Sequence, residues 1–298
     1  MGVGALLAAP SVTASSLVLT LSFPKERVDE GRGRVRFRKE FATMNTDCMF
    51  WIGSAHPVCQ DYAVAGGGLV VLCDGCSSSP ETDIGARLLA RSAFQGKAVQ
   101  TAAECAALLG LPETCLDATL LTIHAENGAF MIRCTGDGVI AFGRQDGSID
   151  MFVIAYAASY PLYPSYSLDD TRLAQWTAQA NNIKTVQHWT LTAADEVVEG
   201  GTRESDSAAE QFSGTADDTR FAAVLSDGVH SFTQTVQTET SRTTVAVPAA
   251  AVLAELLAFK NSRGQFVQRR GVAFRKECEK RGWRHSDDVS LGVVWLGE

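Results

Sequence analysis

The sequence predicts an α+β protein in which antiparallel sheets are covered by pairs of helices. Strand-like segments are joined mostly by Asn-Gly, Asp-Gly or glycine-rich turns, which favour hairpins. Helical patterns occur in two pairs, one after the first Asp-Gly step and one near the C-terminus. This order differs from the strand–helix alternation of a doubly wound parallel sheet. The 298 residues, 46% of them hydrophobic, suffice for one large core, and no internal repeat is evident.

The N-terminal half contains the first hairpin and the first helix pair. Residues 48–55, CMFWIGSA, have strand composition. Residues 61–75, DYAVAGGGLVVLCDG, predict a hairpin that turns at its three glycines. Apolar residues at helical spacing predict helices from Asp83 through IGARLLARSAF and over 97–109.

The chain from residue 117 onward alternates further strands with polar segments. The steps Asn127-Gly128, Asp137-Gly138 and Asp146-Gly147 predict the turns of a strand meander over 117–156. The polar, Gly/Ser-rich segment 196–218 predicts a mobile loop or flap, and the Thr-rich segment 233–244 predicts a loop. Six further elements are expected: a short helix near 169–180, strands over 186–192 and in FAAVLSDGV, helices over 249–260 and 264–281, and a final strand in VSLGVVWL.

Composition excludes several classes of function. The net charge of −8 argues against nucleic-acid binding as the main role. A signal peptide carries a basic residue ahead of its apolar stretch, whereas this apolar N-terminus has none before Lys25. Pro10 also interrupts the apolar stretch, so we expect no membrane span. Several of the eight cysteines lie within apolar strand patterns, which favours a reducing, cytoplasmic location over secretion. Cys73 and Cys76 lack the second pair that a structural zinc site needs.

Four strand-like segments carry an aspartate at one end, and a fifth aspartate precedes the first of them. These residues are Asp74, Asp137, Asp227 and Asp287, with Asp61 as the fifth. Gathered carboxylates repel one another unless a positive charge holds them. We therefore predict that these aspartates meet around a divalent cation. Any one Asp-Gly step alone is more typical of a hairpin turn, and Asp146-Gly147 is interpreted in that way.

Such a cluster indicates hard-metal chemistry. Mg²⁺ and Mn²⁺ prefer oxygen ligands, keep several waters and use few protein carboxylates. Two ions about 3.5–4 Å apart can share a carboxylate and a water, acidify that water and clamp a phosphoryl oxygen. Hydrolysis of a phosphate ester then needs no protein nucleophile. The local context of Asp74, Asp227 and Asp287 suits this arrangement, since each lies at the end of a strand-like segment.

Four motifs together resemble those of the metal-dependent protein phosphatases, the type 2C serine/threonine phosphatases. CQDYAVAGGGLVVLCDG resembles the family's Asn-Glu/Gln-Asp motif, hairpin and first Asp-Gly. IRCTGDGVIAFGRQDG resembles its Gly-Asp-Ser segment, and FAAVLSDGV its Ser-Asp-Gly strand. HSDDVSLGVV resembles its terminal Asp-Asn-Ile/Val-Thr/Ser strand. The motifs follow the family's order from about residue 48 to 296.

The resemblance implies a fold and a division of labour among the carboxylates. The fold would be an α-β-β-α sandwich of two antiparallel sheets flanked by helix pairs, over residues 48–298. Residues 1–47 would form an edge strand (SLVLTLSF) and a basic stretch packed on that domain. The implied metal ligands are Gln60, Asp61, Asp74, Gly75, Asp137, Asp227 and Asp287. Asp74 would bridge two Mn²⁺ or Mg²⁺ ions, the Gly75 carbonyl would bind the second ion, and Asp227 and Asp287 would complete the ligand shell of the first ion. Asp137 would hold a third ion together with Asp227, and Asp61 would orient a metal-bound water.

The sequence departs from the family pattern near these ligands. Gln60 stands where many members have a glutamate, which weakens the second metal site. His56 occupies the position of a phosphate-binding arginine and would instead donate one hydrogen bond or act as a general acid, or simply close a strand end. The loop CSSSPETDIG replaces a glycine-rich one, and Asp288 replaces an asparagine beside the metals.

We therefore predict a Mn²⁺- or Mg²⁺-dependent phosphatase that acts on phosphoserine and phosphothreonine in proteins through a water bridging two ions. The predicted catalytic residues are His56 and Asp61. The partner would be a phosphorylated protein, with no nucleic acid and no membrane, and we expect a monomer. One alternative is a phosphatase-like module that binds phosphoproteins or regulatory partners with little turnover, as Gln60 and His56 suggest. A metal-dependent nuclease is a weaker alternative, because the chain is acidic.

Overall fold

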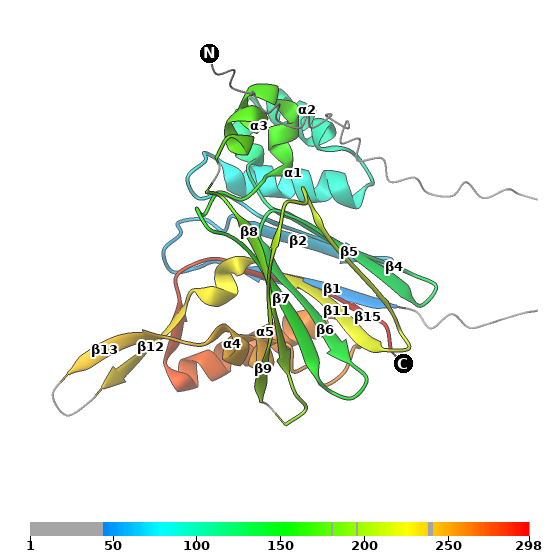
Figure 1. Ribbon diagram of the computed structural model, residues 1–298, viewed down its shortest axis with the longest axis vertical. Helices are drawn as coiled ribbons and strands as arrows, with labels where there is room; N and C mark the ends of the chain where they lie inside the picture. Colours follow the sequence, from blue (N-terminus) through cyan, green and yellow to red (C-terminus); the bar gives the residue numbers. More distant parts are fainter. Residues whose placement is uncertain (1–43, 180, 195, 238–240, 298) are drawn as a thin grey trace, which may run out of the picture.

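Two antiparallel β-sheets stacked face to face form the centre of the structure (Figure 1). The computed structural model describes residues 44–179, 181–194, 196–237 and 241–297. The larger sheet has the order β1 (Asn45–Trp51), β15 (Val289–Trp295), β11 (Thr219–Leu225), β6 (Gly138–Arg144), β7 (Ile149–Tyr156), β8 (Lys184–Leu191) and β9 (Val197–Ser205). The smaller sheet has the order β10 (Glu210–Thr215), β5 (Ala129–Thr135), β4 (Leu120–Glu126), β3 (Leu69–Asp74) and β2 (Asp61–Gly66).

The apolar alternation of the strands explains the stacking. Inward-facing side chains of both sheets form one buried core, which includes Val70 and Leu72 from β3 and Ile140 and Phe142 from β6. Gly292 on β15 lets the sheets approach closely, because a Cβ there would lie 2.2 Å from Cγ1 of Val70. The central strands β6 and β15 are buried on both faces, as strands between two layers must be.

Helices cover both outer faces of the sandwich (Figure 1). The helices α1 (Thr82–Phe94) and α2 (Val99–Leu108) pack on the smaller sheet through alanine and leucine side chains. The helices α4 (Ala249–Leu256) and α5 (Phe266–Arg281) pack on the larger sheet. The remaining helical segments are α3 (Asp170–Thr177) and the 3₁₀ turns η1 (Glu113–Leu116), η2 (Pro164–Leu168) and η3 (Asp227–His230). The predicted fold class, an α+β sandwich of antiparallel sheets flanked by helix pairs, is confirmed.

Two segments predicted as loops are strands. Segment 196–218 forms β9 and β10, which lie at the edges of the two different sheets. β9 is exposed along almost its whole length, so its polar composition is that of an edge strand, which needs no apolar face. Segment 233–244 contributes to a hairpin of β12 (Phe232–Gln237) and β13 (Arg242–Ala246), where β-branched threonines suit strands. With β14 (Trp283–His285) this hairpin forms a three-stranded sheet that extends from the sandwich (Figure 1).

The predicted meander over 117–156 is divided between the two sheets. The turns at Asn127-Gly128 and Asp146-Gly147 connect neighbouring strands as expected. The step at Asp137-Gly138 instead carries the chain from β5 in the smaller sheet to β6 in the larger one. Gly138 has φ +137°, and a Cβ there would lie 2.8 Å from the carbonyl oxygen of Leu225, so a side chain would not fit.

The remaining elements agree with expectation to within a few residues. The predicted strand SLVLTLSF and the N-terminal basic stretch lie outside the described residues. β1 begins at Asn45 and pairs with β15 along its length. All eight cysteines lie in the described ranges and are free thiols. Within those ranges no helix is both long enough and apolar enough to cross a lipid bilayer.

Candidate metal centre

The first hairpin places two of the predicted aspartates side by side. β2 and β3 are joined by a tight turn in which Gly67 and Gly68 both have positive φ, as a two-residue hairpin turn requires. The resulting register pairs Asp61 with Asp74. The end of β3 is fixed by Thr119, whose N–H donates to the Asp74 carbonyl oxygen (2.8 Å) and whose Oγ1 accepts from the Asp74 N–H (3.2 Å).

Three adjacent strands of the larger sheet bring the other aspartates to one end of that sheet. Asp137 directly precedes β6, Asp227 follows β11 after one residue, and Asp287 lies two residues before β15. Because β11 runs antiparallel to both of its neighbours, the start of β6, the end of β11 and the start of β15 share one end of the sheet. The sequence spacing of these residues, by contrast, gives no indication of their proximity.

A buried hydrogen-bond chain joins the two sheets at this end. Ser226 donates from Oγ to Oδ2 of Asp61 (2.7 Å), and the same Oγ accepts from the Ser290 N–H (2.9 Å). All three residues are at most 1% exposed. The chain therefore ties β2 to β11 and β15 and sets the Asp61–Asp74 pair against Asp137, Asp227 and Asp287. Ser226 was not predicted as a site residue, although it directly precedes a predicted ligand.

The carboxylates lie close enough to perturb one another. Burial raises the pKa of Asp74 well above its usual value, and the charges of Asp61, Asp227, Asp137 and Asp287 raise it further. The pKa of Asp137 rises to about 7, through burial first and then the charge of Asp227. Burial also raises the pKa of Asp61 to about 7 against its hydrogen bonds, and burial with the Asp227 charge raises that of Asp287. The structure thus brings all five predicted aspartates together.

His56 faces the same cluster. Its Nε2 lies 3.6 Å from Oδ1 of Asp287, and its Nδ1 lies 3.1 Å from Oδ2 of Asp288, an ion-pair distance without hydrogen-bond alignment. Within the described residues, His56 is the only basic side chain at ion-pair distance from any of the five aspartates. The cluster therefore has little positive compensation from the protein.

Asp288 has a structural role that its sequence context did not indicate. It is 2% exposed, and its two carboxylate oxygens accept from the N–H groups of Gly53 and Gln60, each at 2.6 Å. These bonds fix the loop between β1 and β2 to the start of β15. Gly53 lies so close to Asp287 that a Cβ would meet its carbonyl oxygen at 2.4 Å. Asp288 thus positions His56 and Gln60 beside the cluster.

Gln60 and Gly75 are the chain neighbours of the paired Asp61 and Asp74, and they contact each other. The Gly75 N–H donates to the Gln60 carbonyl oxygen (3.2 Å). The Gln60 side chain donates from Nε2 to Oγ1 of Thr82 (2.9 Å), which fixes the amide. Its buried Oε1 has no hydrogen-bond partner among the described residues. Oδ1 of Asp61 is also buried, and no hydrogen bond reaches it from the part of the chain that the structure describes. Two buried oxygens of this kind are costly unless something positive satisfies them.

The donor set suits a hard divalent cation. Carboxylate, amide and carbonyl oxygens are the ligands that Mg²⁺ and Mn²⁺ prefer, and both ions retain waters that complete their shells. The side-chain positions do not form a finished shell: across the ranges described, no three His, Cys, Asp or Glu side chains are arranged to hold a metal ion. The chemistry of the residues therefore fits a metal, while each ligand assignment remains a proposal.

Comparison with known proteins finds similarity at the level of structure. No family model and no curated protein matches the sequence. A bacterial serine phosphatase aligns over 86% of this chain and 99% of its own, with 11% identity and a TM-score of 0.49. The Staphylococcus aureus serine/threonine phosphatase Stp1 aligns over 92% and 99%, with 10% identity and a TM-score of 0.46. The catalytic domain of the phosphatase PstP, in complex with two manganese ions, aligns over 85% and 97%, with 14% identity and a TM-score of 0.41.

Proposed function

We propose that this protein is a Mn²⁺- or Mg²⁺-dependent phosphatase that hydrolyses phosphoserine and phosphothreonine in proteins. The observation that carries the proposal is the convergence of five aspartates from two sheets at one end of the sandwich, with His56 as their only basic neighbour in the described chain. Such a cluster is costly for the fold unless a cation compensates it. Phosphate monoesters are among the substrates that a multi-metal carboxylate site can hydrolyse, and the net charge of −8 argues against a nucleic acid as the substrate.

The proposed ligand roles follow from position in the cluster. The charges of four other carboxylates raise the pKa of Asp74, so Asp74 would be the central ligand, shared between two ions. Asp227 and Asp287 would complete one ion, and Asp137 would hold a third ion with Asp227. Gly75, through its carbonyl, and Gln60, through the unpartnered Oε1, would bind the second ion.

Divalent cations bound there would supply Lewis-acid chemistry, polarising the phosphoryl group and lowering the pKa of water. The protein itself would orient the reactants. Asp61 is held from one side by Ser226, which leaves Oδ1 free to accept a hydrogen bond from a water molecule. His56, oriented by Asp288, would donate a hydrogen bond to the phosphate or a proton to the leaving oxygen.

A phosphatase-like binding module is the second candidate function. Both ring nitrogens of His56 face carboxylates, Asp287 and Asp288, and no arginine or lysine in the described residues pairs with the five aspartates. A site without an arginine to bind the phosphate group would hydrolyse a bound phosphoprotein only slowly.

Hydrolysis of p-nitrophenyl phosphate and of a phosphothreonine peptide, measured with and without Mn²⁺, tests the proposal. We expect Mn²⁺-dependent turnover that Asp74→Ala and Asp227→Ala each abolish. Asp146→Ala is the matched control, because Asp146 lies in an exposed turn and, among the described residues, its side chain hydrogen-bonds only to Ser148. Tight Mn²⁺ binding without turnover of either substrate would favour the binding module. Absence of Mn²⁺ binding in a folded sample would contradict both candidates.

A further inference from the structure

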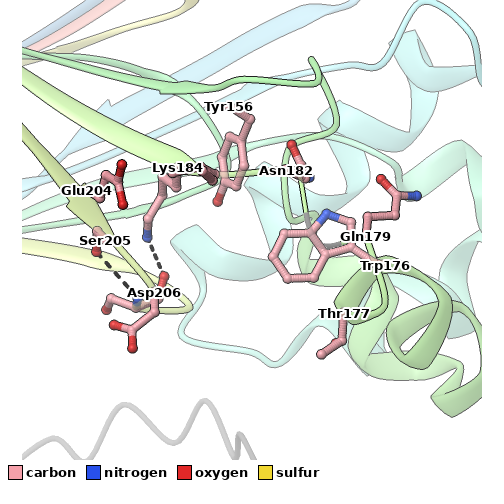
Figure 2. A pocket seen from close by; sticks show the side chains of 11 residues that line it. Tyr156, Trp176, Thr177, Gln179, Asn182, Lys184, Glu204, Ser205 and Asp206 are labelled. Carbon is pink, nitrogen blue, oxygen red and sulfur yellow. Dashed lines mark hydrogen bonds between the residues drawn. The ribbon is translucent and has the colours of Figure 1, made fainter.

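A cavity of about 520 Å³ lies beside the proposed metal centre, between α3 and the β8–β9 side of the larger sheet. Figure 2 shows strand residues on one side of it and residues of α3 and the following loop on the other. The lining residues that matter here are Tyr156, Trp176, Asn182, Lys184, Glu204 and Asp206. The volume is within the range of pockets that accept a small ligand or a single large side chain.

The cavity continues the row of strand ends that bears the aspartates. Gly138 pairs with Ile154, so Tyr156 extends past this pair on the side of Asp137. Tyr156 in turn pairs with Lys184 on β8, and Lys184 pairs with Ser205 on β9. The cavity and the proposed metal centre are therefore neighbours along one end of one sheet. An extended peptide bound at the centre would reach the cavity within a few residues, at about 3.3 Å per residue.

Two aromatic rings form one corner of the cavity. The rings of Tyr156 and Trp176 meet edge to face, with centroids 6.2 Å apart and an interplanar angle of 72°. The Trp176 indole is fixed by a hydrogen bond from Nε1 to the carbonyl oxygen of Tyr160 (3.0 Å). A fixed aromatic face attracts a cation through its quadrupole.

The uncompensated charge of the lining is negative. Lys184 is 4% exposed, and its Nζ lies 2.7 Å from Oε1 of Glu210 and donates to the carbonyl oxygen of Ser207. Glu204 and Asp206 are exposed, and no ion pair to either occurs among the described residues.

The loop after α3 adds a neutral acceptor to the lining. The Asn182 side chain donates from Nδ2 to the carbonyl oxygen of Tyr160 (2.6 Å), while its buried Oδ1 has no hydrogen-bond partner within the described ranges. The cavity thus combines aromatic faces, free carboxylates and an unused acceptor, which together suit a cation that carries several N–H donors.

We propose that this cavity binds an arginine side chain near the phosphorylated residue of the substrate protein. The planar guanidinium group, with its five N–H donors, would stack on Trp176 and donate to acceptors among Glu204, Asp206 and Asn182. This inference rests on the proposed phosphatase function. It adds a preference for phosphoproteins with an arginine close to the phosphorylation site.

A set of phosphothreonine peptides tests the preference. Each peptide carries one arginine at a position from five residues before to five residues after the phosphothreonine, and a matched set carries citrulline there. Citrulline keeps the shape of arginine and removes its charge. We expect kcat/KM to be about tenfold higher for arginine than for citrulline at one or two positions, the size of a cation–π contact with an added ion pair. Turnover of p-nitrophenyl phosphate, which has no such side chain, supplies the reference.

The double variant Glu204→Gln/Asp206→Asn locates the effect. Both side chains are exposed, so the fold should tolerate the change, and we expect the arginine preference to disappear while p-nitrophenyl phosphate turnover stays unchanged. Glu199→Gln is the matched control, since Glu199 is an exposed glutamate of the same strand that does not line the cavity. It should keep the full preference.

The two proposals fail in different ways. If p-nitrophenyl phosphate is hydrolysed but arginine and citrulline peptides react equally at all positions, the arginine site is wrong and the phosphatase function stands. If nothing is hydrolysed, fluorescence anisotropy with the labelled peptides still decides. Tighter binding of an arginine peptide, lost in the double variant, supports the cavity, and equal binding of both peptide sets overturns it.

Discussion

Two regions at this end of the sandwich, one around Glu210 and one formed by the aspartate cluster, shift the pKa of buried acids in opposite directions. Glu210 is held by Lys184 at 2.7 Å and Arg203 at 2.6 Å, and Ser205 donates to it as well. Burial alone would raise its pKa, but these bonds outweigh burial and lower the pKa of Glu210 to about 2. In the aspartate cluster burial and like charges act in the same direction, and the pKa of Asp137 rises to about 7.

The contrast shows that the fold can compensate a buried acid and does not do so at the aspartates. Both regions join the two sheets, one through Lys184 on β8 and Glu210 on β10, the other through Ser226 and Asp61. The first link is complete within the protein. The second leaves oxygens without partners, which is the condition that binding of a cation relieves. Glu210 therefore contributes to stability, whereas our proposal assigns the aspartates to the binding of a cation.

The largest expected effect separates these two roles. Asp74→Asn keeps the size of the side chain and removes the central charge of the cluster, so Mn²⁺-dependent turnover of p-nitrophenyl phosphate should fall by about 10³-fold. Glu210→Gln should leave turnover per folded molecule within about twofold, because Glu210 is compensated inside the protein. Wild-type turnover by Asp74→Asn at full Mn²⁺ occupancy would contradict the assignment of different roles to Asp74 and Glu210.

The next effect concerns stability. Glu210→Gln breaks a buried ion pair and leaves Lys184 without its carboxylate, so the free energy of unfolding should fall by about 3 kcal/mol. Urea denaturation at pH 7 measures this. Glu196→Gln, an exposed glutamate with no ion pair in the described chain, should change it by less than about 0.5 kcal/mol. Equal stabilities of the two variants would mean that the Lys184–Glu210 link contributes nothing.

The same pair predicts a pH dependence of stability. The pKa of Glu210 is lower in the folded protein than the value of 4.5 for a free side chain, so its contribution is present above pH 4.5. It should be lost as the pH falls from 4.5 toward 2, the interval in which the unfolded chain takes up the proton first. Wild type should therefore lose more stability than Glu210→Gln across this interval. Parallel stability curves for the two proteins would contradict the assignment.

Removing a charge from the aspartate cluster should raise the free energy of unfolding, whereas Glu210→Gln should lower it. In the presence of a chelator, Asp137→Asn relieves repulsion with Asp227 in a largely buried setting and should raise the free energy of unfolding, on the order of 2 kcal/mol. Asp146→Asn should lower it slightly, because Ser148 donates two hydrogen bonds to Asp146. Thermal unfolding in EDTA compares them, and destabilisation by both variants would show that Asp137 is not under repulsion.

The smallest expected effect concerns His56. His56→Arg introduces a permanently charged guanidinium group at the edge of the cluster, which can donate two parallel hydrogen bonds to phosphate. This should lower KM for p-nitrophenyl phosphate by about threefold to tenfold. Steady-state kinetics at saturating Mn²⁺ measure the change. His56→Gln is the control, since it can donate a hydrogen bond without charge. A higher KM in His56→Arg would indicate that the new charge pairs with Asp287 instead of phosphate.

The sequence predicted the layers and the five aspartates because both are local patterns. Apolar alternation and glycine turns specify the β2–β3 hairpin, and each aspartate stands beside a recognisable strand. The edge strands β9 and β10 were missed, because an edge strand need not carry an apolar face. The crossing at Asp137-Gly138 was interpreted as a hairpin turn, since the dipeptide is the same and only the partner strands differ.

The supporting residues of the site could not be predicted from local pattern. Ser226 reaches Asp61 across 165 positions of sequence, and Asp288 reaches Gly53 across 235. Serine and aspartate next to a turn are common in any sequence, so nothing marks these two residues before the sheets are stacked. Tyr156 and Trp176 meet for the same reason, through β7 and α3, and the cavity between the elements has no sequence signal.

Calorimetric titration of Mn²⁺ into metal-free protein tests the central claim most directly, that the uncompensated aspartates hold a divalent cation. Wild type and Glu210→Gln should both bind Mn²⁺ with measurable heat, and Asp74→Asn should bind at least one ion fewer. Mn²⁺ at 100 times its Kd should also stabilise wild type by about 2.7 kcal/mol. Identical titrations for wild type and Asp74→Asn, or no binding by folded wild type, would contradict the account.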